Sequence, residues 1–85
     1  MTREDEKYYE NLFDTFATPG WKQFIEELSV GVKTLERNAL YEADGQEKFN
    51  ELRGRVMAMN LIVNYQAVME KAYQSFQERD DNADL

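Results

Sequence analysis

The sequence contains no histidine and no cysteine among its 85 residues. The chain therefore offers no Cys/His zinc site, no thiol nucleophile, no imidazole acid or base and no histidine ligand for haem. Disulfides are excluded too, which fits a reducing compartment. We expect a non-enzymatic protein with no catalytic residues, no cofactor and no metal ion.

Proline and long apolar runs are scarce as well. Pro19 is the single proline, and nowhere do about 18 apolar residues follow one another, so we expect no membrane-spanning helix. The charged N-terminal sequence also lacks the apolar stretch of a signal peptide. Because β-branched residues are few and no segment alternates polar with apolar residues, the pattern predicts an all-α fold.

The charge is strongly of one sign. Seventeen acidic residues stand against ten basic ones, and the net charge of −7 repels a phosphate backbone, so we expect no direct nucleic-acid ligand. Residues 1–29 carry −4, residues 30–56 carry 0 and residues 57–85 carry −3. Such an acidic pole can attract a basic partner. Solubility explains the same distribution and is the preferred interpretation.

Apolar periodicity predicts three helices, over residues 3–16, about 19–40 and about 45–78, in a single domain that spans residues 1–78. Pro19 separates the first two helices, because proline disfavours helical geometry in the residue before it and suits the first position of a helix. Residues 79–85 are acidic and have no apolar period, so we expect a frayed tail.

Capping signals mark the starts of two helices. Thr2 followed by Asp5, and Asp44 followed by Glu47, both have the spacing of a capping box. Glu42 adds a third carboxylate near the second box, but the spacing does not supply the ligands of an EF-hand loop. A turn with a helix cap is therefore the preferred interpretation over a calcium site.

The second and third helices are predicted to form a long antiparallel hairpin. Residues that face each other would then have numbers that sum to about 85. This register places residues 69–76 opposite residues 16–9. It also sets Gly31 level with Gly54, which predicts a close backbone crossing there. The short N-terminal helix is broken off at Pro19, which completes a three-helix arrangement. The apolar seam of the second helix, with alternating steps of four and three, supports this fold: Trp21, Ile25, Leu28, Val32, Leu35 and Ala39.

The third helix is apolar over more than one face, which a single hairpin partner cannot cover. Either the first helix folds over it, or the surface meets another chain, where aromatic and methionine side chains are favoured. A core this small contributes only about 3–5 kcal/mol, so we expect a protein partner and in particular a homo-oligomer. The interface candidates are Tyr9, Phe13, Phe16, Trp21, Met57, Leu61, Tyr65, Val68, Tyr73 and Phe76.

Two asparagines, Asn60 and Asn64, lie one helical turn apart in the most apolar part of the chain. A buried asparagine at a helical interface fixes register or oligomeric state at some cost in stability. The alternative is that both lie on the exposed stripe of the helix. If they are buried, Trp21 is the expected neighbour of Asn64, because their numbers sum to 85.

The stretch from Tyr8 to Leu28, with Thr-Pro-Gly-Trp near its centre, and the element from Phe49 to Arg55, which ends in Arg-Gly-Arg, carry a resemblance. Together with the apolar helix that follows, they resemble small uncharacterised helical proteins of tailed bacteriophages, especially the short-tailed ones, over about residues 8–76. The resemblance implies a phage setting, in the host cytoplasm during infection and in the virion. It assigns no activity and no catalytic or binding residue.

Two functions of different classes are consistent with these features. In the first, the chain is a small structural or assembly component of the virion, which packs on copies of itself or on a larger virion protein. In the alternative, it is an acidic early effector that binds and inhibits a host protein, with recognition or imitation of nucleic acid supplied by the acidic pole. Both act through protein–protein contacts and without a membrane.

Overall fold

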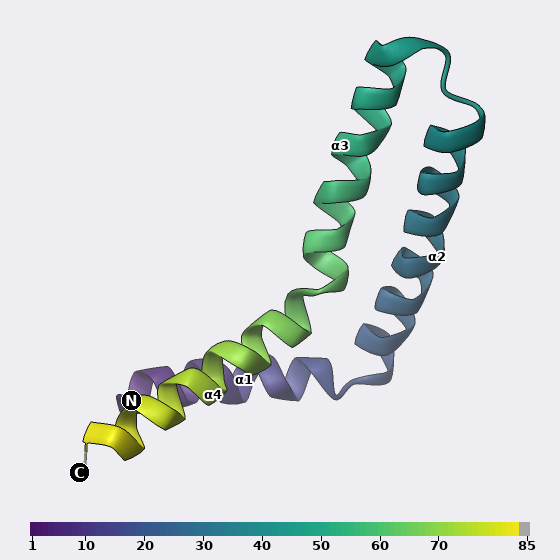
Figure 1. Cartoon of the computed structure of the whole chain (residues 1–85). Helices are drawn as coiled ribbons and strands as arrows, with labels where there is room; N and C mark the ends of the chain where they lie inside the picture. The colour runs from purple at the N-terminus through teal and green to yellow at the C-terminus, as the bar shows by residue number, and fades with distance from the viewer. Residues whose placement is uncertain (84–85) are drawn as a thin grey trace. The chain divides into compact units, whose positions relative to one another are not determined.

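The computed structural model describes residues 1–83 of the chain. In these residues every regular element is a helix: α1 (Arg3–Phe16), α2 (Pro19–Tyr41), α3 (Gly45–Val63) and α4 (Tyr65–Ala83) (Figure 1). The prediction of an all-α protein is confirmed. The bounds of α1 agree with the predicted helix over residues 3–16, and α2 ends one residue beyond its predicted end.

The single helix predicted over residues 45–78 is wrong, because the chain breaks at Asn64 into α3 and α4. Asn64 has φ −92° and ψ 0°, and its N–H still donates to the carbonyl oxygen of Asn60 at 3.0 Å. Weak helix formers mark this place in the sequence, namely asparagine and the β-branched and aromatic residues around it. The predicted apolar stripe also changes direction in this part of the chain.

The predicted frayed tail over residues 79–85 is corrected as well, because α4 continues to Ala83. Asp80 accepts hydrogen bonds from the ammonium group of Met1 at 2.6 Å, and the guanidinium of Arg79 lies 5.9 Å from the centre of the Phe76 ring. The first contact joins the end of α4 to the N-terminal residue, and the second lies within α4. Asp84 and Leu85 lie outside the described residues.

The chain divides into two compact units. The terminal unit comprises Met1–Lys22 and Tyr65–Leu85, and the central unit comprises Gln23–Asn64. The terminal unit therefore contains α1, the first turn of α2 and α4. The central unit contains the rest of α2 and all of α3.

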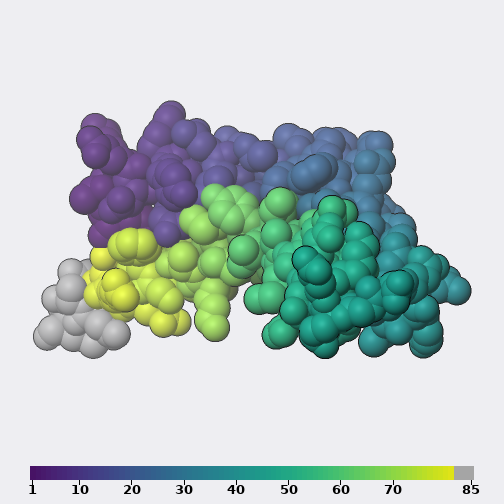
Figure 2. All heavy atoms as spheres, turned by 90° about the horizontal axis from the view of Figure 1, so that it is seen from above, coloured from purple at the N-terminus to yellow at the C-terminus, as the bar shows by residue number. Residues whose placement is uncertain are grey.

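The terminal unit is held together by aromatic rings between α1 and α4, which lie side by side in both views (Figures 1 and 2). Tyr9 lies 5.9 Å from Phe76 between ring centres, and Phe13 lies 5.1 Å from Tyr73. These pairs agree with the predicted facing of residues 9 and 13 with residues 76 and 73. At the other end of the cluster, Phe16 contacts Tyr65 at 5.9 Å.

In the central unit, α2 and α3 run in opposite directions (Figure 1), and their buried side chains are Val32 and Leu52. A Cβ atom added to Gly31 would lie 3.2 Å from the methyl carbon of Met59. These residue numbers sum to 90, whereas the predicted register gives about 85. The predicted close crossing with Gly54 is wrong, since nothing lies within 4 Å of a Cβ built there.

The first predicted capping box is confirmed and the second is wrong. The hydroxyl of Thr2 accepts from the N–H of Asp5 at 3.1 Å, and the Asp5 carboxylate accepts from the N–H of Thr2 at 3.1 Å. Asp44 is the N-cap of α3, but its side chain makes no capping hydrogen bond. Gly45 follows with a left-handed φ of +88°, which changes the direction in which the chain enters the helix.

Removing the Thr2 cap gives a testable prediction. Thr2→Ala is expected to lower the free energy of unfolding by about 1 kcal/mol at pH 7, because it removes the N-cap acceptor. Thr34→Ala is the control, since the Thr34 hydroxyl bonds to a carbonyl inside α2 and caps no helix. Urea unfolding of both variants, followed by circular dichroism, measures the difference.

The loss of stability caused by Thr2→Ala depends on pH, because the same capping box includes the Asp5 carboxylate. Hydrogen bonds from the backbone and side chain of Thr2 lower the pKa of Asp5 below its ordinary value. Because the folded pKa lies below the unfolded value of about 3.9, this stabilisation is complete above that pH and is lost as the pH falls through the folded value. The difference between wild type and Thr2→Ala should therefore shrink at about pH 3. A difference that stays constant from pH 7 to pH 3 would contradict this role of Asp5.

Candidate interaction surfaces

Seven of the ten interface candidates lie in one aromatic cluster of the terminal unit. Tyr9 and Phe16 are buried, with exposed fractions of 5% and 4%, and the other five are partly buried. Their rings contact one another within the chain, so they form the core of this unit. The seven are Tyr9, Phe13, Phe16, Trp21, Tyr65, Tyr73 and Phe76.

The cluster is closed at one end by polar contacts. The indole N–H of Trp21 donates to the side-chain oxygen of Gln66 at 3.1 Å, and the Trp21 ring lies 5.1 Å from that of Phe16. A hydrogen bond with the phenol of Tyr8 raises the pKa of Tyr65 above its ordinary value. These contacts join α1 and the first turn of α2 to α4.

The remaining three candidates, Met57, Leu61 and Val68, are exposed. Leu61 has an exposed fraction of 76% and Met57 of 58%, values at which the side chain contributes little to a core. Met57 and Leu61 lie on α3 in the central unit, four residues apart and therefore on one face of the helix. Val68 lies on α4 in the terminal unit.

Sequence reasoning missed other exposed apolar side chains. Leu40, with an exposed fraction of 73%, and Val30, with 60%, lie on α2. Neither residue lies at a position of the apolar seam that runs through Val32. A position outside that seam is the sequence signal that could have identified Leu40 and Val30 as exposed. The others are Tyr8, Phe24, Tyr41 and Ile62.

An apolar groove of about 270 Å³ runs between α2 and α3 in the central unit. Ala39, Phe49 and Val56 are partly buried along it, and the exposed side chains of Leu40 and Met57 stand at its rim. Glu36 on α2 and Arg53 on α3 also line it and are its charged groups. The groove is thus an apolar surface with one charge of each sign.

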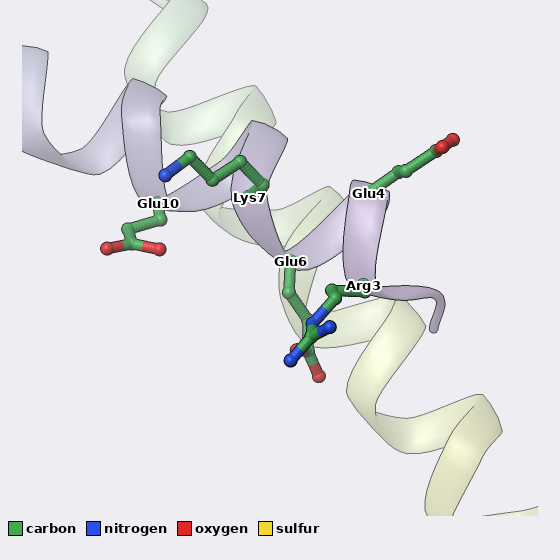
Figure 3. A pocket seen from close by; sticks show the side chains of 5 residues that line it. All are labelled: Arg3, Glu4, Glu6, Lys7 and Glu10. Atoms are coloured by element: carbon green, nitrogen blue, oxygen red, sulfur yellow. The ribbon is translucent and has the colours of Figure 1, made fainter.

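A charged hollow of about 690 Å³ lies along α1. It is lined by Arg3, Glu4, Glu6, Lys7 and Glu10, which all belong to α1, and Figure 3 shows the Glu4 side chain pointing away from those of Arg3 and Glu6. The hollow is therefore formed by the charged side chains of a single helix.

The two asparagines have different environments. Asn60 is partly buried on α3, whereas Asn64 is exposed and ends that helix. The two predicted alternatives were that both asparagines are buried or that both are exposed, and neither alternative describes the pair. Trp21 was expected beside Asn64 only if Asn64 was buried, and this condition does not hold because Asn64 is exposed.

The net charge is concentrated in one unit. Ten acidic and five basic residues belong to the terminal unit, against seven acidic and five basic residues in the central unit. Glu6, Glu10 and Asp14 lie along a hollow beside the rings of Tyr9 and Phe13. The terminal unit therefore carries −5 and the central unit only −2.

Comparisons with protein-family models, with curated proteins and with solved structures give no match to this chain. Within residues 1–83, none of the helices combines the length and the apolar character needed to cross a membrane. The same residues contain no group of three acidic side chains placed to hold a metal ion.

Proposed function

We propose that this chain is a non-enzymatic protein that acts through protein–protein contacts, as a small structural or assembly component of a tailed-phage virion. The phage setting comes from the resemblance carried by the Thr-Pro-Gly-Trp and Arg-Gly-Arg elements. The protein–protein contact is supported by the exposed surface of the central unit.

One observation carries the proposal. In the central unit Val32 and Leu52 are buried, while apolar side chains of similar size are exposed on both of its helices: Phe24, Val30, Leu40, Tyr41, Met57, Leu61 and Ile62. Two helices with so small a core gain little stability from their own burial. Covering the exposed side chains with another protein surface would contribute about 25 cal/mol for each Å² of apolar area removed from water.

The proposed architecture is the predicted one, a long antiparallel hairpin with a short N-terminal helix broken off at Pro19. Two observations within the units support it. The rings of α1 and α4 pair in the terminal unit, and Gly31 and Met59 approach in the central unit. The corrected element is the second arm, which consists of α3 and α4 rather than one helix.

Mass spectrometry of purified virions tests the proposed function. A structural or assembly component is expected at a fixed ratio to the major virion proteins, after treatment that removes loosely bound host proteins. A capsid protein of the same phage serves as the internal standard. Absence of the chain from particles, with the capsid protein present, contradicts a role as a virion component.

A specific observation supports the alternative, an acidic effector that binds a host protein. The terminal unit holds five of the seven net negative charges, and Glu6, Glu10 and Asp14 follow one side of α1 at steps of four residues. Such a row of charge favours fast association with a basic surface, at low salt especially. Capture of one host protein from infected cells, lost above about 0.5 M salt because of screening, would support this alternative.

A further inference from the structure

The apolar groove between α2 and α3 is an unpartnered surface within the part of the chain that the structure describes. Leu40 and Met57 stand exposed at its rim, beside the partly buried Ala39, Phe49 and Val56. Apolar side chains exposed together over a groove mark an interaction site more often than single exposed residues do. A ligand for this groove must therefore be largely apolar.

The charges along the groove are complementary to each other. Glu36 is contributed by α2 and Arg53 by α3, and neither makes an ion pair within residues 1–83. In a two-fold symmetric contact both subunits use the same patch. Each contact between two different residues therefore occurs twice, once with each copy contributing the first residue. A patch with one charge of each sign is suited to such a contact, because the negative group of each copy can then face the positive group of the other. We call these two pairs between the copies cross-pairs, and both are attractive.

The distribution of net charge favours the same occupant. Two copies that meet through central units bring together charges of −2 each, whereas contact through terminal units would bring together charges of −5. Like charges that face each other across an interface oppose association. The central unit is therefore the part of this acidic chain through which self-association meets the least repulsion.

We propose that a second copy of this chain occupies the groove, in a two-fold symmetric dimer in which Glu36 of each copy pairs with Arg53 of the other. The rim side chains Leu40 and Met57 of one copy cover the apolar floor of the groove in its partner. This inference rests on the proposed function, in that it takes the protein to act through protein–protein contacts, and it names the face and the partner.

Exchanging the two charges tests the pairing. Glu36→Arg and Arg53→Glu, each made alone, create two repulsive cross-pairs in the symmetric dimer and are expected to weaken dimerisation at least tenfold. An equimolar mixture of the two single variants should restore it, because both cross-pairs are attractive in the mixed dimer. Restoration on mixing can only come from contact between chains. Sedimentation equilibrium of each variant and of the mixture, over micromolar concentrations, measures the dissociation constants.

The rim is tested with matched variants of exposed residues. Met57→Glu is expected to abolish the dimer, whereas Val30→Glu, which alters a side chain of almost equal exposure outside the groove, should leave its dissociation constant within twofold. Circular dichroism of both variants confirms that the helices are intact.

Three results would overturn the proposal. These are a chain that remains monomeric at all concentrations, a dimer that ignores the charge exchanges, and a dimer that Val30→Glu disrupts as strongly as Met57→Glu. None of the three bears on the presence of the chain in virions. A failure of this inference is therefore distinguishable from a failure of the proposed function.

Discussion

Tyr9→Ala is expected to unfold the terminal unit at 25 °C. Tyr9 has an exposed fraction of 5%, and its ring lies 5.2 Å from that of Tyr73 and 5.9 Å from that of Phe76. Truncating a buried aromatic side chain to alanine typically costs about 3–5 kcal/mol, from lost burial and from the cavity that remains. A core of this size contributes about as much in total, so the loss leaves little or no net stability.

Near-ultraviolet circular dichroism measures this effect, because it reports rings held in fixed positions and α1 contacts α4 largely through rings. Tyr41→Ala is the matched control, since Tyr41 is exposed and lies in the central unit. The free energy of unfolding of Tyr41→Ala should differ from that of wild type by no more than about 0.5 kcal/mol. If Tyr9→Ala keeps the near-ultraviolet spectrum and the unfolding midpoint of wild type, the aromatic cluster is not the core of the terminal unit.

Val32→Asp is expected to unfold the central unit. Val32 is one of the two buried side chains of this unit, which has little other core. A carboxylate at this position would be buried without a partner, at a cost of at least about 3 kcal/mol in addition to the lost apolar burial. Helical circular dichroism at 222 nm should fall, and urea unfolding should lose the part of the transition that α2 and α3 contribute.

Val30→Asp makes the same chemical change two residues away, where the side chain is 60% exposed. The helix propensity changes equally in both variants, so the difference between them isolates burial. The free energy of unfolding of the control, Val30→Asp, should lie within about 0.5 kcal/mol of the wild-type value. Equal effects of the two substitutions would show that the burial of Val32 does not stabilise the central unit.

The helical character and most helix ends follow from local chemistry in the sequence. Thr2 and Asp5 have the side chains and the spacing of a capping box, and Pro19 suits the first turn of a helix whatever the rest of the chain does. The pairing of α1 with α4 was also predictable, because aromatic residues recur at helical spacing in both segments. The break at Asn64 is marked in the sequence by weak helix formers, but their effect is too small to decide between a bend and a continuous helix.

The sequence by itself determined that this protein is acidic, helical and without histidine or cysteine chemistry, because these properties depend on composition and short-range spacing. The tertiary structure decided which apolar side chains serve the core and which stay exposed. Tyr73 and Met57 are both apolar residues on helices, yet Tyr73 contacts the rings of α1 while Met57 stands at the rim of an open groove. Burial depends on what a distant segment places opposite each residue, and periodicity along one helix contains no such information.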